Sequence, residues 1–216
     1  SKGPKGETGA TGATGQLTVQ QALAAGHQVT AFARTPSHVP MADHPNLTIV
    51  QGDALNAVDV AKAIQADTDV VISTLGHRRG GEKSSDLLSK SMAHIVGAMQ
   101  ATGVTRLIVM SGAGVWIEGH DNPGILEYII RFALKTLSGH VLEDSEQMVR
   151  YIMESGLDWT IPRAPRMVVG EHTQTYRVGY LGKNAGTTIS YADMADFIVH
   201  EITASAYSHQ APVISY

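Results

Sequence analysis

The chain has 216 residues, of which 43% are hydrophobic and 17% charged, and its net charge is −4. This length and apolar content predict one domain with a sizeable core, and the charge excludes a general attraction to nucleic acid or anionic membranes. The absence of cysteine excludes disulfides and thiolate metal sites. No apolar run approaches the ~18 to 20 residues that span a bilayer, so we expect a soluble, cytoplasmic protein without a membrane segment.

Near its beginning the chain carries glycine at every third position, in the sequence GPKGETGATGATG (3–15). Collagen has this period, but here it ends at Gly15 and continues into an apolar helix pattern that stops at Gly26. Gly9, Gly12 and Gly15 can instead form a tight turn that directs the N–H groups of the following helix at a pyrophosphate. A plain glycine-rich turn is the alternative interpretation.

An apolar strand of about five residues should precede such a turn. The first eight residues, SKGPKGET, contain none, and their proline is poorly suited to a central strand. We therefore interpret 1–8 as an irregular or non-native N-terminus.

Strands and helices alternate along the rest of the chain. The predicted strands are 27–33, 47–53, 69–76, 104–116 and LDWTIPR; the predicted helices are about 57–66, 84–103, 140–156 and 190–205. Asn56 with Asp59, and Ser190 with Asp193, are typical of helix N-caps. The run DVVISTLG (69–76) predicts a strand buried on both faces. Such alternation predicts right-handed βαβ units, an α/β doubly wound parallel sheet and ligands at the carboxyl ends of the strands.

The segment 117–139 carries an additional apolar helix between two units of the sheet. It could cover a pocket or form an oligomer surface, and the sequence leaves both possibilities open.

Three predicted strands end in residues with a nucleotide-binding interpretation. Arg34 follows the strand 27–33, and no acidic residue accompanies it in AFARTPSH, which favours the 2′-phosphate of NADP(H) over NAD(H). Asp53 can bind the adenine amine or form an Asx-turn. Leu75 and Gly76 leave room for a flat cofactor beside the backbone, or form an ordinary turn. A solvated surface side chain is the alternative for Arg34.

Ser111 is the candidate catalytic residue because it lies at the end of a strand, in RLIVMSGAG, with Gly112 and Gly114 close behind it, so its hydroxyl would be at the carboxyl edge of the sheet. Its alternative role is to donate a hydrogen bond to a carbonyl at the strand end.

Other residue types that could take part in catalysis are disfavoured by their spacing. None of Tyr128, Tyr151 and Tyr191 has a lysine four residues later, which disfavours a tyrosine-driven carbonyl reduction. The histidines show no HExxH pattern, so we expect no metal site. His77, with Arg78 and Arg79, could bind an anionic substrate or be solvated.

Taken in order, GATGATGQLTVQQAL, VTAFAR, VQGDAL, DVVISTLG, LIVMSGAG, SGLDWTIPRAPR, ISYADMADF and HQAPVISY resemble the atypical short-chain dehydrogenase/reductases. The similarity is to the branch with biliverdin/flavin reductase and the NmrA-like proteins, and it covers about 9–216. It implies one Rossmann domain with a small substrate-side lobe. One departure is Arg166, where biliverdin/flavin reductase carries a histidine.

The resemblance implies that Gly9–Gln16 holds the pyrophosphate, Arg34 the 2′-phosphate, and Ser111 the nicotinamide side, with Ala164 and Pro165 shaping the pocket there. The full set of candidate cofactor residues is Gly9, Thr11, Gly12, Ala13, Thr14, Gly15, Gln16, Arg34, Asp53, Ala54, Leu75, Gly76, Ser111, Gly112, Ala164 and Pro165. The expected activity is NADPH-dependent hydride transfer to an electron-poor acceptor such as a flavin or quinone. The alternative is an NADP(H)-binding redox sensor without turnover; we expect a small-molecule partner and a possible homo-oligomer.

Overall fold

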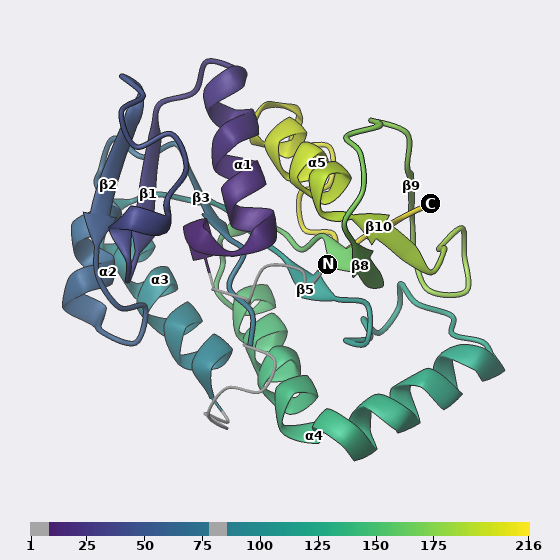
Figure 1. Cartoon of the computed structure of the whole chain (residues 1–216). Coiled ribbons are helices and arrows are strands. Elements are labelled where there is room, and N and C mark those ends of the chain that lie inside the picture. Colours follow the sequence, from purple (N-terminus) through teal and green to yellow (C-terminus); the bar gives the residue numbers. More distant parts are fainter. Residues whose placement is uncertain (1–8, 78–85) are drawn as a thin grey trace.

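Helices and strands alternate through most of the chain, as the sequence predicts. The computed structural model describes residues 9–77 and 86–216 (Figure 1). The helices are α1 (Ala13–Ala24), α2 (Ala57–Ala63), α3 (Leu87–Thr102), α4 (Ile125–Met153) and α5 (Tyr191–Ala204), with 3-10 turns η1 (Gly9–Thr11) and η2 (Pro36–His38). The strands are β1 (Val29–Ala33), β2 (Leu47–Gln51), β3 (Val70–Ser73), β4 (Arg106–Val109), β5 (Ser111–Gly112), β6 (Asp158–Thr160), β7 (Arg163–Ala164), β8 (Arg166–Val168), β9 (Arg177–Gly179), β10 (Thr188–Ser190) and β11 (Val213–Ser215). The expectation for residues 1–8 lies outside the described residues.

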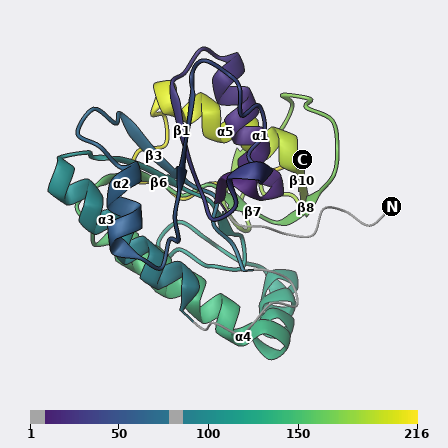
Figure 2. The same cartoon turned by 60° about the vertical axis from the view of Figure 1, so that its left-hand side comes forward.

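Parallel pairing dominates the sheets. β1 pairs with β2, β4 lies between β3 and β6, β7 lies between β5 and β11, and β8 pairs with β10, all in parallel. The antiparallel pair is β9 with β11. Figure 2 shows α1 and α5 on one side of the strands and α2, α3 and α4 on the other. The predicted single-domain α/β fold with a doubly wound, Rossmann-like parallel sheet is thereby confirmed.

The apolar core is divided into three clusters. The largest lies between the sheet and the helices α3 and α4, and includes Met99, Leu107 and Ile152. A second lies under α5 around Ile198, and a third joins α1 to β1. Helices on both faces explain why all four residues of β4 are buried.

Local signals in the sequence explain several element ends. Ser190 Oγ accepts a hydrogen bond from the N–H of Asp193 (2.9 Å), which confirms the predicted N-cap of α5. Asn56 Oδ1 caps α2 by accepting from the N–H of Val58 (3.0 Å). Gly103 ends α3 with a φ of 78°, in the left-handed region that favours glycine.

Two elements differ from the sequence-based expectation, and the two helices expected between 117 and 156 agree with it. The predicted strand 104–116 is two strands, because β4 pairs with β3 and β6 whereas β5 pairs with β7. The predicted helix 140–156 and the additional helix of 117–139 are both present in α4, as two helical segments that meet at a kink at Ser138 (φ −148°, ψ 38°). β3 was expected to be buried on both faces, but Val70, Val71 and Ile72 are only half-buried. The cause is a cavity along one edge of β3, described below.

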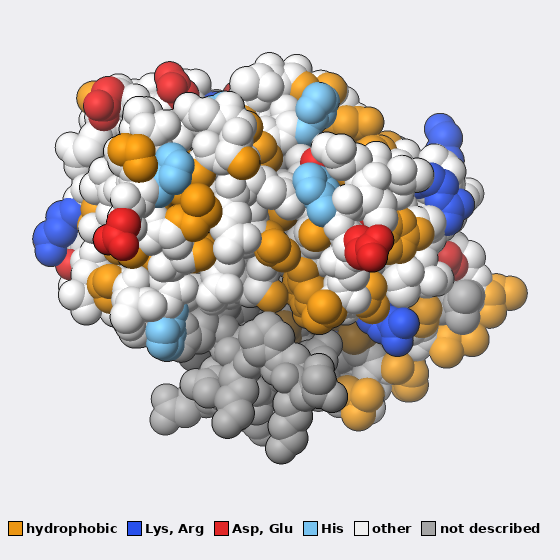
Figure 3. All heavy atoms as spheres, turned by 45° about the horizontal axis from the view of Figure 1, so that its top comes forward, with side chains coloured by type: hydrophobic (Ala, Val, Ile, Leu, Met, Phe, Trp, Pro, Cys, Tyr) orange, Lys and Arg blue, Asp and Glu red, His pale blue; other side chains and the backbone are white. Residues whose placement is uncertain are grey.

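The first half of α4 projects from the body of the molecule (Figure 1). Its exposed apolar side chains include Ile125, Ile129, Phe132 and Leu137, and Figure 3 shows hydrophobic side chains gathered over this helix at the lower right. Arg131 anchors it by donating to the carbonyl of Gly114 and by pairing with Glu146.

Candidate functional site

The turn before α1 has a geometry that only glycine permits. Gly9 has a φ of +76°, and its carbonyl accepts from the N–H of Gly12 (3.1 Å). A Cβ atom at Gly15 would lie 1.8 Å from the Gly9 oxygen and 2.9 Å from Thr74 Oγ1. α1 therefore packs directly on the turn because position 15 has no side chain.

The N-terminus of α1 has backbone donors without an acceptor in the described part of the chain. Gly12 is the N-cap and supplies no side-chain cap, and the first bond of the helix runs from Gln16 N to Gly12 O (2.8 Å). The N–H groups of Ala13, Thr14 and Gly15 precede it and have no acceptor among the described residues. This arrangement, with the helix dipole, suits an anion such as a pyrophosphate.

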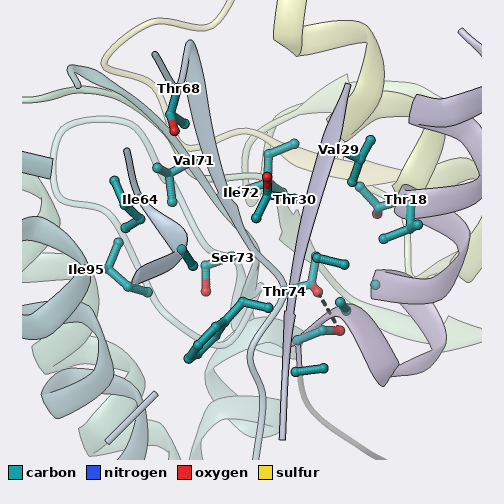
Figure 4. Close-up of a pocket in the computed structure, with 18 of the residues that line it drawn as sticks. Thr18, Val29, Thr30, Ile64, Thr68, Val71, Ile72, Ser73, Thr74 and Ile95 are labelled. Carbon is teal, nitrogen blue, oxygen red and sulfur yellow. Dashed lines mark hydrogen bonds between the residues drawn. The ribbon is translucent and has the colours of Figure 1, made fainter. Parts of the chain in front are cut away.

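The side chain of Gln16 has a structural role beside this turn. Its amide donates to the carbonyls of Thr11 (3.1 Å) and His38 (3.1 Å), so it ties the turn to the loop after β1. Thr74 Oγ1 donates to the Gly9 carbonyl (3.2 Å), which fixes the end of β3 to the same turn (Figure 4). Leu75 follows, with Cδ2 3.7 Å from where a Cβ of Gly9 would be.

Arg34, Asp53, Ala54 and Leu75 line one cavity together with Gly9. Arg34 is exposed at the end of β1. Asp53 is exposed after β2, and its Oδ1 accepts from the N–H of Leu55 (3.0 Å), so the Asx-turn interpretation is observed. The Ala54 carbonyl bonds to His94 Nδ1 (3.0 Å). The structure therefore brings these four predicted residues, which follow β1, β2 and β3, into the same cavity as Gly9 of the turn.

Ser111 lies where β5 meets β7. Its N–H donates to the Pro162 carbonyl (3.0 Å), and Gly112 is paired with Ala164, which Pro165 follows. Ser111 is 8% exposed as a residue, and its buried Oγ has no hydrogen-bond partner among the described residues. The expected alternative, in which this hydroxyl satisfies a strand-end carbonyl, is not observed. An unpaired buried hydroxyl is costly, so this atom fits a ligand that bonds to it.

Asp144 is a buried residue that the sequence analysis missed. Its carboxylate accepts from the N–H groups of Leu88 (2.8 Å) and Ser89 (3.0 Å) and from Ser89 Oγ (2.6 Å) at the start of α3. It also bonds to His77 Nε2 at 2.8 Å. His77, considered above as a ligand for an anionic substrate, therefore faces a carboxylate. Nothing in the spacing of these distant residues could have indicated this contact.

The expectation for Arg78 and Arg79 lies outside the described residues.

A second buried ion pair lies next to the predicted nicotinamide side. Arg163 is fully buried, and its two terminal nitrogens donate to Asp121 at 2.6 and 2.8 Å. Burial alone would raise the pKa of Asp121, but hydrogen bonds from Arg163 and from the N–H of Ile117 hold it below its usual value. Because Arg163 directly precedes Ala164, this pair fixes β7 beside Ser111.

Two partly buried tyrosines of the described chain, Tyr176 and Tyr180, have a pKa above the usual value. Burial, followed by the hydrogen bond to Asp196, raises the pKa of Tyr176. Among residues 9–77 and 86–216, no group of three or more acidic or histidine side chains could hold a metal ion. No helix within those ranges has the length and apolar character needed to cross a bilayer.

The comparisons with known proteins identify the family. A family model described as NAD(P)H-binding matches residues 9–205. A curated 3-beta-hydroxysteroid dehydrogenase of Mycolicibacterium neoaurum is 32% identical over 126 residues, which is 53% of this chain and 34% of that protein. The match thus spans about a third of the length of the curated relative.

Solved structures share the fold at low sequence identity. A short-chain dehydrogenase/reductase from Veillonella parvula, in complex with NADP, superposes with a TM-score of 0.77 at 19% identity, covering 96% of this chain and 92% of that one. ChuY, described as an anaerobillin reductase from Escherichia coli O157:H7, has a TM-score of 0.75 at 20% identity, covering 99% and 94%.

Proposed function

The chain belongs to the NAD(P)H-binding family, and from this premise we propose that it is an NADPH-dependent oxidoreductase that reduces an electron-poor acceptor such as a flavin or quinone. The observation that carries the proposal is the glycine turn, because Gly15 can carry no side chain there and the first N–H groups of α1 have no acceptor among the described residues. Both features fit a dinucleotide pyrophosphate.

The preference for NADP(H) over NAD(H) rests on Arg34. This side chain is exposed at the end of β1 and lines the same cavity as Gly9. A guanidinium at this position can pair with a 2′-phosphate, and the flanking residues AFARTPSH supply no carboxylate for the ribose hydroxyls.

NADPH, when bound, supplies a hydride from its nicotinamide ring. The chain's own residues bind and orient the cofactor and the acceptor, and they keep water away from both. The Ser111 hydroxyl offers a hydrogen bond to the nicotinamide amide or to the acceptor, and the buried Arg163 and Asp121 hold Ala164 in place beside it. A flavin or quinone needs little proton transfer from the protein, which agrees with the absence of a lysine four residues after Tyr128, Tyr151 or Tyr191. ChuY, described as a reductase, supports the use of this fold for reduction.

A second candidate function is an NADP(H) sensor that reports to another protein without turnover. The exposed apolar side chains on the first half of α4, such as Ile129 and Phe132, favour a role in contact with a macromolecule. A second copy of this chain could cover the same α4 side chains under either function, and it would make the protein a homo-oligomer. Sedimentation of the wild type and of Phe132→Glu should then show an assembly that the charge dissociates.

The test of the enzymatic proposal combines binding with turnover. Calorimetry should detect NADPH binding, and NADPH oxidation should be measured with flavins, quinones and biliverdin as acceptors. Ser111→Ala should lower kcat/KM about tenfold, the loss of one neutral hydrogen bond, while the Kd for NADPH changes less than about threefold. Tight NADPH binding without turnover on any acceptor would favour the sensor. The absence of NADPH binding to folded protein would exclude both.

A further inference from the structure

The two helical segments of α4 differ in how firmly the core holds them. The second segment, 139–153, carries buried side chains that include Leu142, Met148 and Ile152. In the first segment, 125–137, none of the side chains that the structure describes is buried. Figure 1 shows this first segment projecting from the body of the molecule. Because few buried contacts hold it, the first segment can move at a smaller cost in free energy than the second.

The kink between the segments has the properties of a hinge. Ser138 has a φ of −148° and a ψ of 38°, which lie outside the helical region. Gly139 follows it, and a Cβ atom there would meet nothing within 4 Å. A glycine with open space around it can change its backbone dihedral angles at little steric cost. The chain can therefore bend between the two segments without disturbing either helix.

The first segment is fastened to the loop that follows Ser111. Arg131 donates to the carbonyl of Gly114 and pairs with Glu146 of the second segment. The side chains of this ion pair are 26% and 29% exposed, and ion pairs that water reaches contribute little to stability. Leu134 also packs here, since its Cδ1 lies 3.0 Å from where a Cβ of Gly114 would be. The fastening is therefore specific in its partners but weak enough to open.

Trp116, in the same loop, lies against the first segment. The guanidinium carbon of Arg131 is 4.5 Å from the centre of the Trp116 ring. The ring of Tyr128 meets the Trp116 ring edge to face, with 4.7 Å between the ring centres. Two side chains of the first segment therefore cover a tryptophan that follows the candidate catalytic serine in the chain.

An acceptor must also be able to reach Ser111. This residue is 8% exposed, and β5, which it begins, is in contact with α4. Its Oγ has no hydrogen-bond partner among the described residues. A flat acceptor can bond to this hydroxyl only when part of the surrounding structure moves aside. The first segment of α4 is the neighbouring part that the core holds least, so it is the part that moves at the smallest cost.

We propose that the first segment of α4 is a lid on the acceptor side of Ser111, hinged at Ser138 and Gly139 and held closed by Arg131. When the lid opens, Gly114 and Trp116 are uncovered and a ring the size of a flavin can enter. When it closes, it keeps water away from the acceptor during hydride transfer. The inference rests on the proposed function, because it names the part of the chain that admits the acceptor.

Disulfides can lock the lid cleanly, because the chain contains no cysteine. Gly114→Cys with Leu134→Cys joins the loop to the lid, and the second substitution removes the methyl group that would lie 3.0 Å from the new Cβ. The matched control is Gly114→Cys with Leu142→Cys, because Leu142 Cδ1 lies 3.7 Å from the same Cβ position but belongs to the second segment. Only the disulfide between positions 114 and 134 fastens the part beyond the hinge.

Turnover is the first measurement. Oxidation of the pair at positions 114 and 134 should lower kcat/KM for flavin reduction at least about tenfold, and reduction of the disulfide followed by gel filtration should restore it. Oxidation of the pair at positions 114 and 142 should change kcat/KM less than about twofold, because the lid stays free to move. The Kd for NADPH should change less than about twofold in both, since the lid is on the acceptor side.

Acrylamide quenching of tryptophan fluorescence reports the lid without any turnover. Trp159 is 5% exposed in the core, so the quencher acts mainly on Trp116. The quenching constant should fall at least about twofold when the pair at positions 114 and 134 is oxidised, and rise at least about twofold in Arg131→Gln. Arg150→Gln, an exposed arginine of the second segment, is the control and should leave the constant unchanged.

Equal effects of the two disulfides on kcat/KM, or no effect of either, would overturn the lid. Quenching that neither the lock nor Arg131→Gln changes would also overturn it, whatever the turnover. If the wild type reduces no acceptor, the proposed function fails, while the quenching constants still establish or refute the opening of the segment. If neither disulfide forms, the comparison of Arg131→Gln with Arg150→Gln decides the question.

Discussion

At the scale of single residues, Arg34 is the side chain on which the choice between NADPH and NADH rests. Charge-assisted hydrogen bonds contribute about 1.5–3 kcal/mol, so Arg34→Ala should raise the Kd for NADPH by about 10- to 150-fold. The Kd for NADH, which has no 2′-phosphate, should change less than about threefold. Calorimetric titration of both nucleotides measures the two values.

Arg150→Ala is the matched control, because Arg150 is an exposed arginine near the end of α4. It removes the same charge and should leave the Kd for NADPH unchanged within about twofold. An equal loss for NADPH and NADH in Arg34→Ala would contradict a 2′-phosphate contact.

At the scale of elements, the packing of α1 on the glycine turn makes a prediction about stability. The added methyl of Gly15→Ala would lie 1.8 Å from the Gly9 oxygen, so the turn and helix must separate. We expect a loss of about 3 kcal/mol in the free energy of unfolding and loss of NADPH binding. Urea unfolding and calorimetry check the two effects.

Gly97→Ala, on α3, should change the free energy of unfolding in the opposite direction. Gly97 is exposed on α3, and a Cβ there would meet nothing within 4 Å. Alanine should therefore stabilise the protein by about 0.5–1 kcal/mol through helix propensity. If Gly15→Ala stabilised the protein as Gly97→Ala does, the close approach of Gly15 to the Gly9 oxygen would be contradicted.

Elements with local signals could be predicted from the sequence, and elements set by distant partners could not. Ser190 as a cap and Gly103 as a helix end depend on neighbouring residues only, and both are confirmed. The break between β4 and β5 arises because each pairs with different strands, and the capping of α3 by Asp144 joins distant parts of the chain. The glycine spacing indicated a tight turn before α1, but not that β1 and β3 pair with different strands.

At the scale of the whole molecule, buried carboxylates predict the pH range of stability. Asp121 and Asp193 are both buried, and hydrogen bonds outweigh burial to hold the pKa of each below its usual value of 3.8. The unfolded chain therefore binds more protons than the folded one in acid. Their stabilisation is present above about pH 4 and is lost as the pH falls, by up to about 1.4 kcal/mol per pH unit for each group. Urea unfolding between pH 2 and pH 7 measures it.

Asp121→Asn should reduce this acid dependence, at a cost of about 3–5 kcal/mol because Arg163 is left buried without a charge partner. Asp43→Asn is the control, because Asp43 is exposed in the loop before β2 and should change the free energy of unfolding by less than about 0.5 kcal/mol. An unchanged acid profile in Asp121→Asn would assign the dependence to other groups.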